Sequence, residues 1–305
     1  MSKLKMADMT RGGWLEVEFN YPRDWTIAAE SGGLAEAYMR IDSPRAPKIE
    51  IKWERIKKGT KIYPHTIVNN FIETYKKNAK RKTKVEIIES GTLKVSDHKA
   101  VFTRWRAEME AVTLAWICNE ENKAFLLGYY LEPGEQWMDI ASWLAPGIVC
   151  HTADDYWRCR LLGTEFKIRK GYWISKRVLM VGKVTLLFKN KDGAALLLHW
   201  SSFAKELLAK NQDLVRWFKR DGPKEVKEVI KTIPEDKLKV NEVGNEATFD
   251  KQVSKGLLMR KAIRENLRIW HDQVNNRIFL TCYSGPESKF SDLEALESSI
   301  MVEIE

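Results

Sequence analysis

The chain contains two similar fifteen-residue segments, 154 positions apart, which form a repeated phrase. WICNEENKAFLLGYY begins at Trp116, and WHDQVNNRIFLTCYS begins at Trp270. An ungapped comparison matches aromatic, apolar and turn residues: Trp116/Trp270, Asn122/Asn276, Phe125/Phe279, Leu126/Leu280 and Tyr129/Tyr283. Solenoid repeats have periods of about 20 to 50 residues, so a phrase repeated at this distance indicates duplication of a whole domain.

The similarity between the two halves extends on the N-terminal side of the phrase. Two further stretches of the first half have counterparts in the second: EFNYPRDWTI (18–27) matches EFKIRKGYWI (165–174), and PKIEIKW (47–53) matches AALLLHW (194–200). The offset between the copies is 147 here, so the second copy has gained about seven residues between 200 and 270. We expect them in RDGPKE (220–225) or in NEVGNEATFDKQ (241–252).

The polar segment HTADDYW (151–157) lies where the two copies meet. We therefore predict two similar domains, 1–152 and 153–305. A chain of 305 residues has the length for two domains, because single hydrophobic cores stop growing near about 250 to 300 residues.

Each copy combines strand and helix patterns. Leu15, Val17 and Phe19 alternate with polar residues, as in a strand, and the repeated phrase predicts a hairpin that turns at NEEN (119–122). After Pro64 the apolar residues follow the spacing of an amphipathic helix: Val68, Phe71, Ile72 and Tyr75. A second helix is predicted after Pro133-Gly134, and Asp221-Gly222-Pro223 should break the first helix of the second copy. The predicted class is α+β, with helices flanking an antiparallel sheet in each domain.

A family resemblance follows from the order of these motifs. FNYPRDW (19–25), a strand ending in Trp53, an amphipathic helix, DHKA (97–100) and the tryptophan-containing hairpin resemble the PsbP-like (Mog/PsbP/DcrB-like) superfamily. The resemblance implies two tandem α/β/α sandwiches. The second copy departs from the pattern, since SKGL (254–257) replaces DHKA. Members of this superfamily are mainly accessory or binding proteins without shared catalytic residues, so the resemblance supplies no site residue.

Sequence motifs of catalysis are absent. The chain has no GxSxG or SxxK nucleophile motif, and its glycine pairs RGGW and SGGL lack the GK[ST] ending of a phosphate loop. His271-Asp272 is not accompanied by a second His–Asp pair. We predict no catalytic residue, no metal site and no cofactor.

The four cysteines leave two alternatives open. Cys150, His151 and Cys159 are side chains that zinc prefers, although the chain contains no CxxC pair. A disulfide between Cys150 and Cys159 is the other alternative. The favoured interpretation is that these cysteines, with Cys118 and Cys282, are reduced and buried and act as small apolar residues.

Positive charge is the one global feature with functional content. The net charge is +9, and basic residues gather in two clusters, one at 75–84 and one near Trp217: Lys76, Lys77, Lys80, Arg81, Lys82 and Lys84; and Lys219, Arg220, Lys224 and Lys227. Such clusters can contact nucleic-acid phosphates. The alternative is a solvated surface with cations at helix C-termini. Abundant Lys and Glu with only four Gln is also typical of thermophile proteins.

These observations favour a non-catalytic binding or accessory protein whose two domains present a composite surface to a protein partner. The first alternative is a nucleic-acid-associated protein that uses the basic clusters, and the second is an enzyme with a site between the domains. The N-terminal segment has no apolar stretch typical of a secretion signal, and the longest apolar run, GAALLLHW (193–200), is too short to span a bilayer. We expect a cytoplasmic protein without a membrane span.

Overall fold

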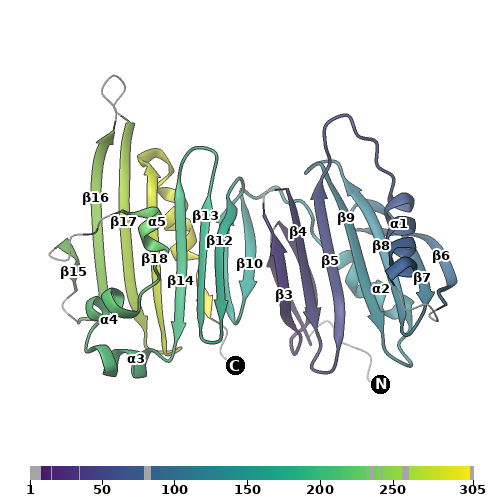
Figure 1. The fold of residues 1–305 in the computed structure, drawn as a ribbon, viewed down its shortest axis with the longest axis horizontal. Helices are drawn as coiled ribbons and strands as arrows, with labels where there is room; N and C mark the ends of the chain where they lie inside the picture. Colours follow the sequence, from purple (N-terminus) through teal and green to yellow (C-terminus); the bar gives the residue numbers. More distant parts are fainter. Residues whose placement is uncertain are drawn as a thin grey trace. The chain divides into compact units, whose positions relative to one another are not determined.

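The computed structural model describes residues 8–14, 16–33, 35–78, 84–231, 233, 237–241, 243–255 and 261–302. The chain divides into two compact units, Met1–Gly163 and Thr164–Glu305 (Figure 1). The sequence placed the boundary between residues 152 and 153. The division falls later because β10 (Tyr156–Leu161) packs against β1 (Met9–Trp14) and so belongs to the first unit.

The first unit is built on a seven-stranded antiparallel sheet. Its strand order is β3-β4-β5-β9-β8-β7-β6. The strands are β3 (Thr26–Gly32), β4 (Glu36–Asp42), β5 (Pro47–Arg55), β6 (Glu86–Val95), β7 (His98–Arg106), β8 (Glu110–Cys118) and β9 (Lys123–Leu131). Strands β5 and β9 are far apart in sequence but are neighbours in the sheet, with Trp53 opposite Phe125.

The second unit repeats this strand order. Its seven-stranded sheet runs β12-β13-β14-β18-β17-β16-β15. The strands are β12 (Trp173–Met180), β13 (Lys183–Lys189), β14 (Ala195–Ser202), β15 (Lys239–Val240), β16 (Glu246–Lys255), β17 (Lys261–Asp272) and β18 (Arg277–Pro286). Trp200 lies opposite Phe279, as Trp53 lies opposite Phe125. The duplication read from the sequence is therefore a duplication of sheet topology.

The repeated phrase forms the β8–β9 hairpin in one unit and the β17–β18 hairpin in the other, as predicted. Asn122 and Asn276 occupy the turns with φ of 52° and 51°, a left-handed conformation in which asparagine is favoured. Their carbonyl groups accept backbone hydrogen bonds from Ile56 (2.9 Å), the first residue beyond β5, and from Ala204 (3.0 Å), the second residue beyond β14. The shared asparagines thus fix the turns of the two hairpins. Each turn also forms a hydrogen bond with the segment that follows the neighbouring strand, β5 or β14.

The extra residues of the second copy lie in one longer hairpin. Val101 pairs with Ala115, 14 positions along the chain, in β7–β8. The corresponding pair in β16–β17 is Ala247 and Ile269, 22 positions apart. The additional length therefore falls between 247 and 269 and overlaps only partly with the predicted segment 241–252.

Helices cover the sheet of the first unit on two faces. Helix α1 (Pro64–Asn78) begins at Pro64 as predicted, and its Tyr75 packs on Trp105 of β7. Helix α2 (Trp137–Gly147) lies on the opposite face, where Trp137 packs on Phe102. Residues 102 and 105 have opposite parity on one strand, so the two helices face opposite sides of the sheet. The hairpin of β1 and β2 (Val17–Pro22) shares the face of α2.

The second unit carries shorter helices. On one face lie α3 (Ala204–Asn211), α4 (Leu214–Asp221) and α5 (Val226–Val229), which pack on β14 and β16–β18. On the other face Glu297 of α6 (Ser291–Ser298) accepts a hydrogen bond from Thr281 of β18, next to β11 (Thr164–Arg169) and β19 (Met301–Val302). Helix α4 ends before Gly222-Pro223, so the predicted helix break is confirmed.

The fold is mainly β, which corrects the predicted α/β/α sandwich. Of the six α-helices in the described residues, only α1 and α2 are longer than ten residues. In the second unit Phe203 and Gln212, with φ of 63° and 73°, flank α3 and limit it to two turns. In the first unit the β1–β2 hairpin takes part of the area that a helix would occupy.

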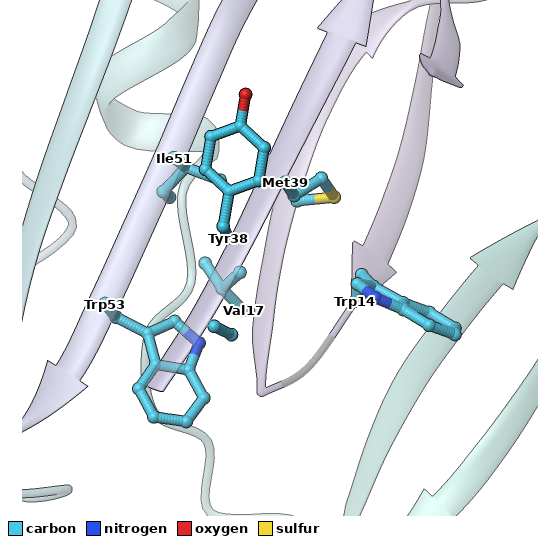
Figure 2. A pocket seen from close by; sticks show the side chains of 7 residues that line it. Trp14, Val17, Tyr38, Met39, Ile51 and Trp53 are labelled. Atoms are coloured by element: carbon cyan, nitrogen blue, oxygen red, sulfur yellow. The ribbon is translucent and has the colours of Figure 1, made fainter. Parts of the chain in front are cut away.

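A tight apolar contact attaches this hairpin to the sheet of the first unit. Trp14 and Val17 line a narrow space there together with Met39, Ile51 and Trp53 (Figure 2). The space between these side chains leaves no room for a water molecule, so this contact is core packing. Within the described residues, no helix is both long enough and apolar enough to cross a membrane.

Candidate metal centre

Four potential metal ligands come together at one end of the first sheet. His98 is the first residue of β7 and Cys118 the last residue of β8. The antiparallel register that pairs Val101 with Ala115 brings these two strand ends side by side. Cys150 and His151 follow α2 in the chain. Their segment is fixed by two backbone hydrogen bonds between Val149 and Glu18 of β2, at 2.9 and 2.7 Å.

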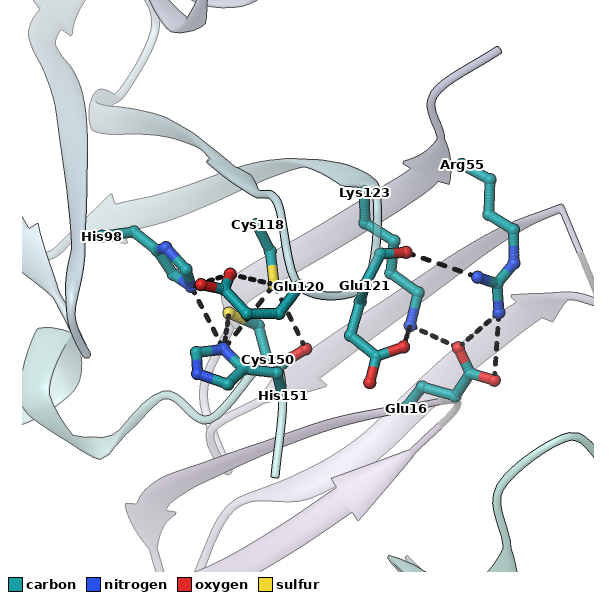
Figure 3. Close-up of polar contacts among 9 residues, drawn as sticks. All are labelled: Glu16, Arg55, His98, Cys118, Glu120, Glu121, Lys123, Cys150 and His151. Atoms are coloured by element: carbon teal, nitrogen blue, oxygen red, sulfur yellow. Dashed lines mark hydrogen bonds and ion pairs between the residues drawn. The ribbon is translucent and has the colours of Figure 1, made fainter. Parts of the chain in front are cut away.

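The donor atoms of this Cys2His2 cluster, defined as His98, Cys118, Cys150 and His151, all lie within 4.8 Å of one another (Figure 3). Nδ1 of His151 is 3.2 Å from Nε2 of His98, 3.6 Å from Sγ of Cys118 and 3.8 Å from Sγ of Cys150. In a tetrahedral zinc site, bonds of about 2.0–2.1 Å to nitrogen and about 2.3 Å to sulfur separate the ligand atoms by about 3.3 to 3.8 Å. The cluster is therefore close to the geometry that one tetrahedral ion needs.

The two thiols of the cluster are buried and differ in acidity. A hydrogen bond from Cys150 lowers the pKa of Cys118 to about 6, and the backbone of Glu121 and the nearby histidines act in the same direction. The same hydrogen bond, together with burial, raises the pKa of Cys150. Cys118 is thus the more acidic of the two thiols. A thiolate is the form of cysteine that binds metals.

Acidic side chains surround the exposed edge of the cluster. An Asp97 carboxylate oxygen lies 3.3 Å from Nε2 of His98, and the other oxygen lies 3.6 Å from Nε2 of His151. Glu120 lies 3.6 Å from Sγ of Cys118. For His151, the carboxylate beside Nε2 orients the ring and leaves Nδ1 free to coordinate. The arrangement attracts a cation and orients His151 toward the common centre.

A buried ion pair supports the hairpin next to the cluster (Figure 3). The side chain of Lys123 is fully buried; its ammonium group contacts Glu16 and lies 4.5 Å from the centre of the Trp53 ring. Arg55 also pairs with Glu16, at 3.1 Å, and donates to the carbonyl of Glu121. These contacts hold the turn that connects Cys118 to β9.

The predicted basic site residues lie away from this cluster. Lys76 and Lys77 are exposed in the last turn of α1, where Lys76 pairs with Glu73 at 2.7 Å, and Lys84 is exposed. Lys80, Arg81 and Lys82 fall outside the described residues. In the second unit the basic residues are exposed near the end of α4 and around α5: Lys219, Arg220, Lys224 and Lys227. No contact of these side chains indicates nucleic acid, so nucleic-acid binding stays a prediction.

The cysteine pattern of the sequence indicates part of the cluster. All four cysteines are buried and none is in a disulfide, so Cys150 is not bonded to Cys159. Cys150 and His151 are cluster members, but Cys159 is not. His98 and Cys118 are candidate ligands that the sequence did not indicate. Their only local signal is that each lies at a strand end beside an acidic turn, in DHKA and CNEEN.

Among the described residues, the cluster occurs in the first copy and not in the second. The alignment of the repeated phrase matches Cys118 to Asp272, and the strand register that matches Val101 to Ala247 puts Gly244 at the position of His98. The SKGL segment, matched to DHKA from the sequence, begins instead in the longer hairpin. Asp272 instead accepts hydrogen bonds from Asn275 inside its own hairpin turn, at 2.7 and 3.1 Å. The two units therefore share a fold but differ in this chemistry.

Comparisons with known proteins give little guidance on function. No family model matches the chain, and no curated protein shows significant sequence similarity to it. The solution structure of cyanobacterial PsbP (CyanoP) from Synechocystis sp. PCC 6803 aligns at a TM-score of 0.35 and 12% identity, covering 50% of this chain and 97% of that one. A crystal structure from Bacteroides thetaiotaomicron VPI-5482 aligns at 0.28 and 13%, covering 51% of this chain and 50% of the other. Scores this low establish neither a shared fold nor a shared function.

Proposed function

We propose that the first unit binds one Zn²⁺ ion through the Cys2His2 cluster, and that the protein is a non-catalytic binding or accessory protein. The observation that carries this proposal is the convergence of four soft donors from three separate segments within 4.8 Å. Two sulfur and two nitrogen ligands in a tetrahedron select zinc over the oxygen-preferring ions magnesium and calcium.

A structural role fits this ligand set better than a catalytic one. Structural zinc sites use four protein ligands, whereas catalytic sites keep one position open for water or substrate. Cys118 and Cys150 are both 0% exposed, so no substrate reaches either sulfur directly. This burial also argues against a cysteine–histidine nucleophile formed by Cys118 and His151. The ion would join β7 and β8 to the segment that follows α2.

The tryptophan of the repeated phrase supplies a further argument. Nε1 of Trp116 is buried without a hydrogen-bond partner among the described residues. The indole lies beside the Cys150 thiol and opposes the rise in the pKa of that thiol. A neutral thiol is a weak acceptor, whereas a metal-bound thiolate is a good one. Zinc binding would therefore also provide an acceptor for the Trp116 N–H group.

The assignment of each unit to the PsbP-like superfamily is part of the same proposal. Its support is the order of motifs in the sequence together with the identical strand order of the two sheets. An accessory role agrees with the absence of a catalytic motif from the sequence. Four cysteines without a disulfide suit a reducing compartment such as the cytoplasm.

Competition with a chromogenic zinc chelator tests the proposal. We expect the metal-free protein to bind one Zn²⁺ per chain, and Cys118→Ser or His98→Ala to weaken binding by at least about tenfold, in line with the loss of a first ligand. Cys282→Ala is the matched control, because Cys282 is equally buried and lies in the second unit. Equal zinc affinity in Cys118→Ser and Cys282→Ala would rule the site out.

A further inference from the structure

An open hollow in the second unit is a second candidate site, and it does not depend on the metal centre. Its volume is about 640 Å³. It lies between the β12–β13 turn, the end of β14 and helices α3 and α4, which Figure 1 shows together at one end of this sheet. Small-molecule sites commonly have volumes of about 300 to 1,000 Å³.

Two buried hydroxyl groups belong to the wall of the hollow nearest the sheet. Thr185 and Ser201 are 1% and 5% exposed, and both bond to His199, at 2.8 and 2.9 Å. Burial lowers the pKa of His199 to about 3, so the imidazole is neutral and has one donor and one acceptor nitrogen. One hydroxyl therefore donates to His199 and the other accepts from it. The accepting hydroxyl keeps its own proton for a further hydrogen bond.

This histidine does not make Ser201 a nucleophile. A serine–histidine pair needs an imidazole that takes up a proton, and a carboxylate usually stabilises the resulting cation. Thr185 occupies the carboxylate position here and carries no charge. The Thr185–His199–Ser201 group consequently serves as a fixed set of hydrogen-bonding atoms.

The outer wall of the hollow is apolar and unusually exposed. Met180 is 59% exposed, Val181 is 102% exposed and Phe203 is 61% exposed. Phe203 has a φ of 63°, a strained conformation for a bulky residue. Its ring packs near Gly182 of the β12–β13 turn, and Ser202 donates a backbone hydrogen bond to Gly182 at 2.8 Å. This backbone conformation places the aromatic ring of Phe203 in solvent at the rim of the hollow.

Basic side chains outnumber acidic side chains at the hollow. Four basic and three acidic residues line it: Lys183, Lys210, Arg220 and Lys224; and Glu206, Asp221 and Glu225. Asp221 accepts from Asn211 at 2.9 Å and faces Arg220 at 3.6 Å, and Glu225 pairs with Lys176 at 3.3 Å. Within the described part of the chain, Lys210 and Lys224 form no ion pair of their own.

We propose that this hollow binds a small amphipathic anion, a carboxylate carried on an apolar chain. The lysines would meet the carboxylate, the exposed apolar residues would cover the chain, and the hydroxyl groups of Thr185 and Ser201 would supply hydrogen bonds. A lipid surface would also attract apolar residues flanked by lysines. The hollow and its buried hydroxyl groups favour the small molecule, because a flat membrane surface would fill neither.

Calorimetric titration of the full chain with decanoate below its micelle concentration tests the proposal. We expect saturable binding of one molecule per chain, with decanol at least about tenfold weaker and acetate without measurable binding. Lys210→Ala combined with Lys224→Ala should weaken decanoate binding about three- to tenfold, as expected for two exposed charge contacts. Lys227→Ala is the control, since Lys227 is exposed nearby and does not line the hollow.

Three results would overturn the proposal. The first is no saturable binding of decanoate. The second is equal decanoate affinity in the double lysine variant and in Lys227→Ala. The third is binding to vesicles of anionic lipid without binding of monomeric decanoate, which would assign the surface to a membrane.

Discussion

Nε2 of His98 lies 3.2 Å from Nδ1 of His151. At this distance one nitrogen must carry a proton and the other must accept it, so the contact depends on the tautomers of both rings. Two protonated rings would repel each other. A metal ion removes this dependence, because it accepts a lone pair from both nitrogens at once. The pair is thus better suited to coordination than to a hydrogen bond alone.

Zinc should stabilise the native protein against unfolding. An ion that binds only the folded state, at a free concentration 100 times its Kd, contributes about 2.7 kcal/mol to the free energy of unfolding. We expect zinc to raise the Tm of the metal-free wild-type protein and to raise the Tm of Cys118→Ser by clearly less. Scanning calorimetry with zinc, and with magnesium as the control ion, checks this. An equal shift with magnesium would contradict the proposed ligand set.

The buried ammonium group of Lys123 should be required for stability. Lys123→Met removes the buried partner of Glu16, although Arg55 continues to pair with that carboxylate. We expect a loss of about 3 kcal/mol in the free energy of unfolding, measured by urea denaturation. Lys52→Met is the matched control, because Lys52 is exposed and 3.9 Å from Glu36. It should cost less than about 0.5 kcal/mol, and equal losses in the two variants would show that burial of Lys123 is unimportant.

The buried neutral His199 should make stability fall in acid. Its pKa is lowered from 6.5 to about 3 by burial and by Lys183, so below pH 6.5 the unfolded chain binds a proton that the folded chain does not. The contribution of neutral His199 to the free energy of unfolding is complete above pH 6.5. It is lost as the pH falls toward 3, by at most about 1.4 kcal/mol per pH unit. The difference in unfolding free energy between wild type and His199→Asn, followed from pH 7.5 to 4.5, should change with this slope. A difference independent of pH would show that His199 has the same pKa in the folded and unfolded chains and would contradict its burial as a neutral group.

Local sequence patterns predicted helices and strands of the fold, but they did not predict how short the helices of the second unit are. Helix α1 follows the helical spacing of apolar residues after Pro64, and the β8–β9 hairpin follows the alternation around NEEN. Both patterns are formed by residues that are close together in the chain. The helices of the second unit are shorter because Phe203 and Gln212 take left-handed conformations that no residue type in this stretch signals.

The metal centre could not be predicted from spacing. His98 and Cys118 meet through the register of β7 and β8, and Cys150 and His151 reach them only because Val149 bonds to Glu18. Each contact joins residues far apart in the chain. A search for paired cysteines at short spacing therefore finds only Cys150, His151 and the wrong neighbour, Cys159.

X-ray absorption spectroscopy of the zinc-loaded protein tests the central claim most directly. The Cys2His2 cluster requires two sulfur ligands at about 2.3 Å and two nitrogen ligands at about 2.0–2.1 Å. In Cys118→Ser the sulfur count should fall to one, and in Cys282→Ala it should stay at two. A shell made only of oxygen and nitrogen in the wild-type protein would contradict the proposed site.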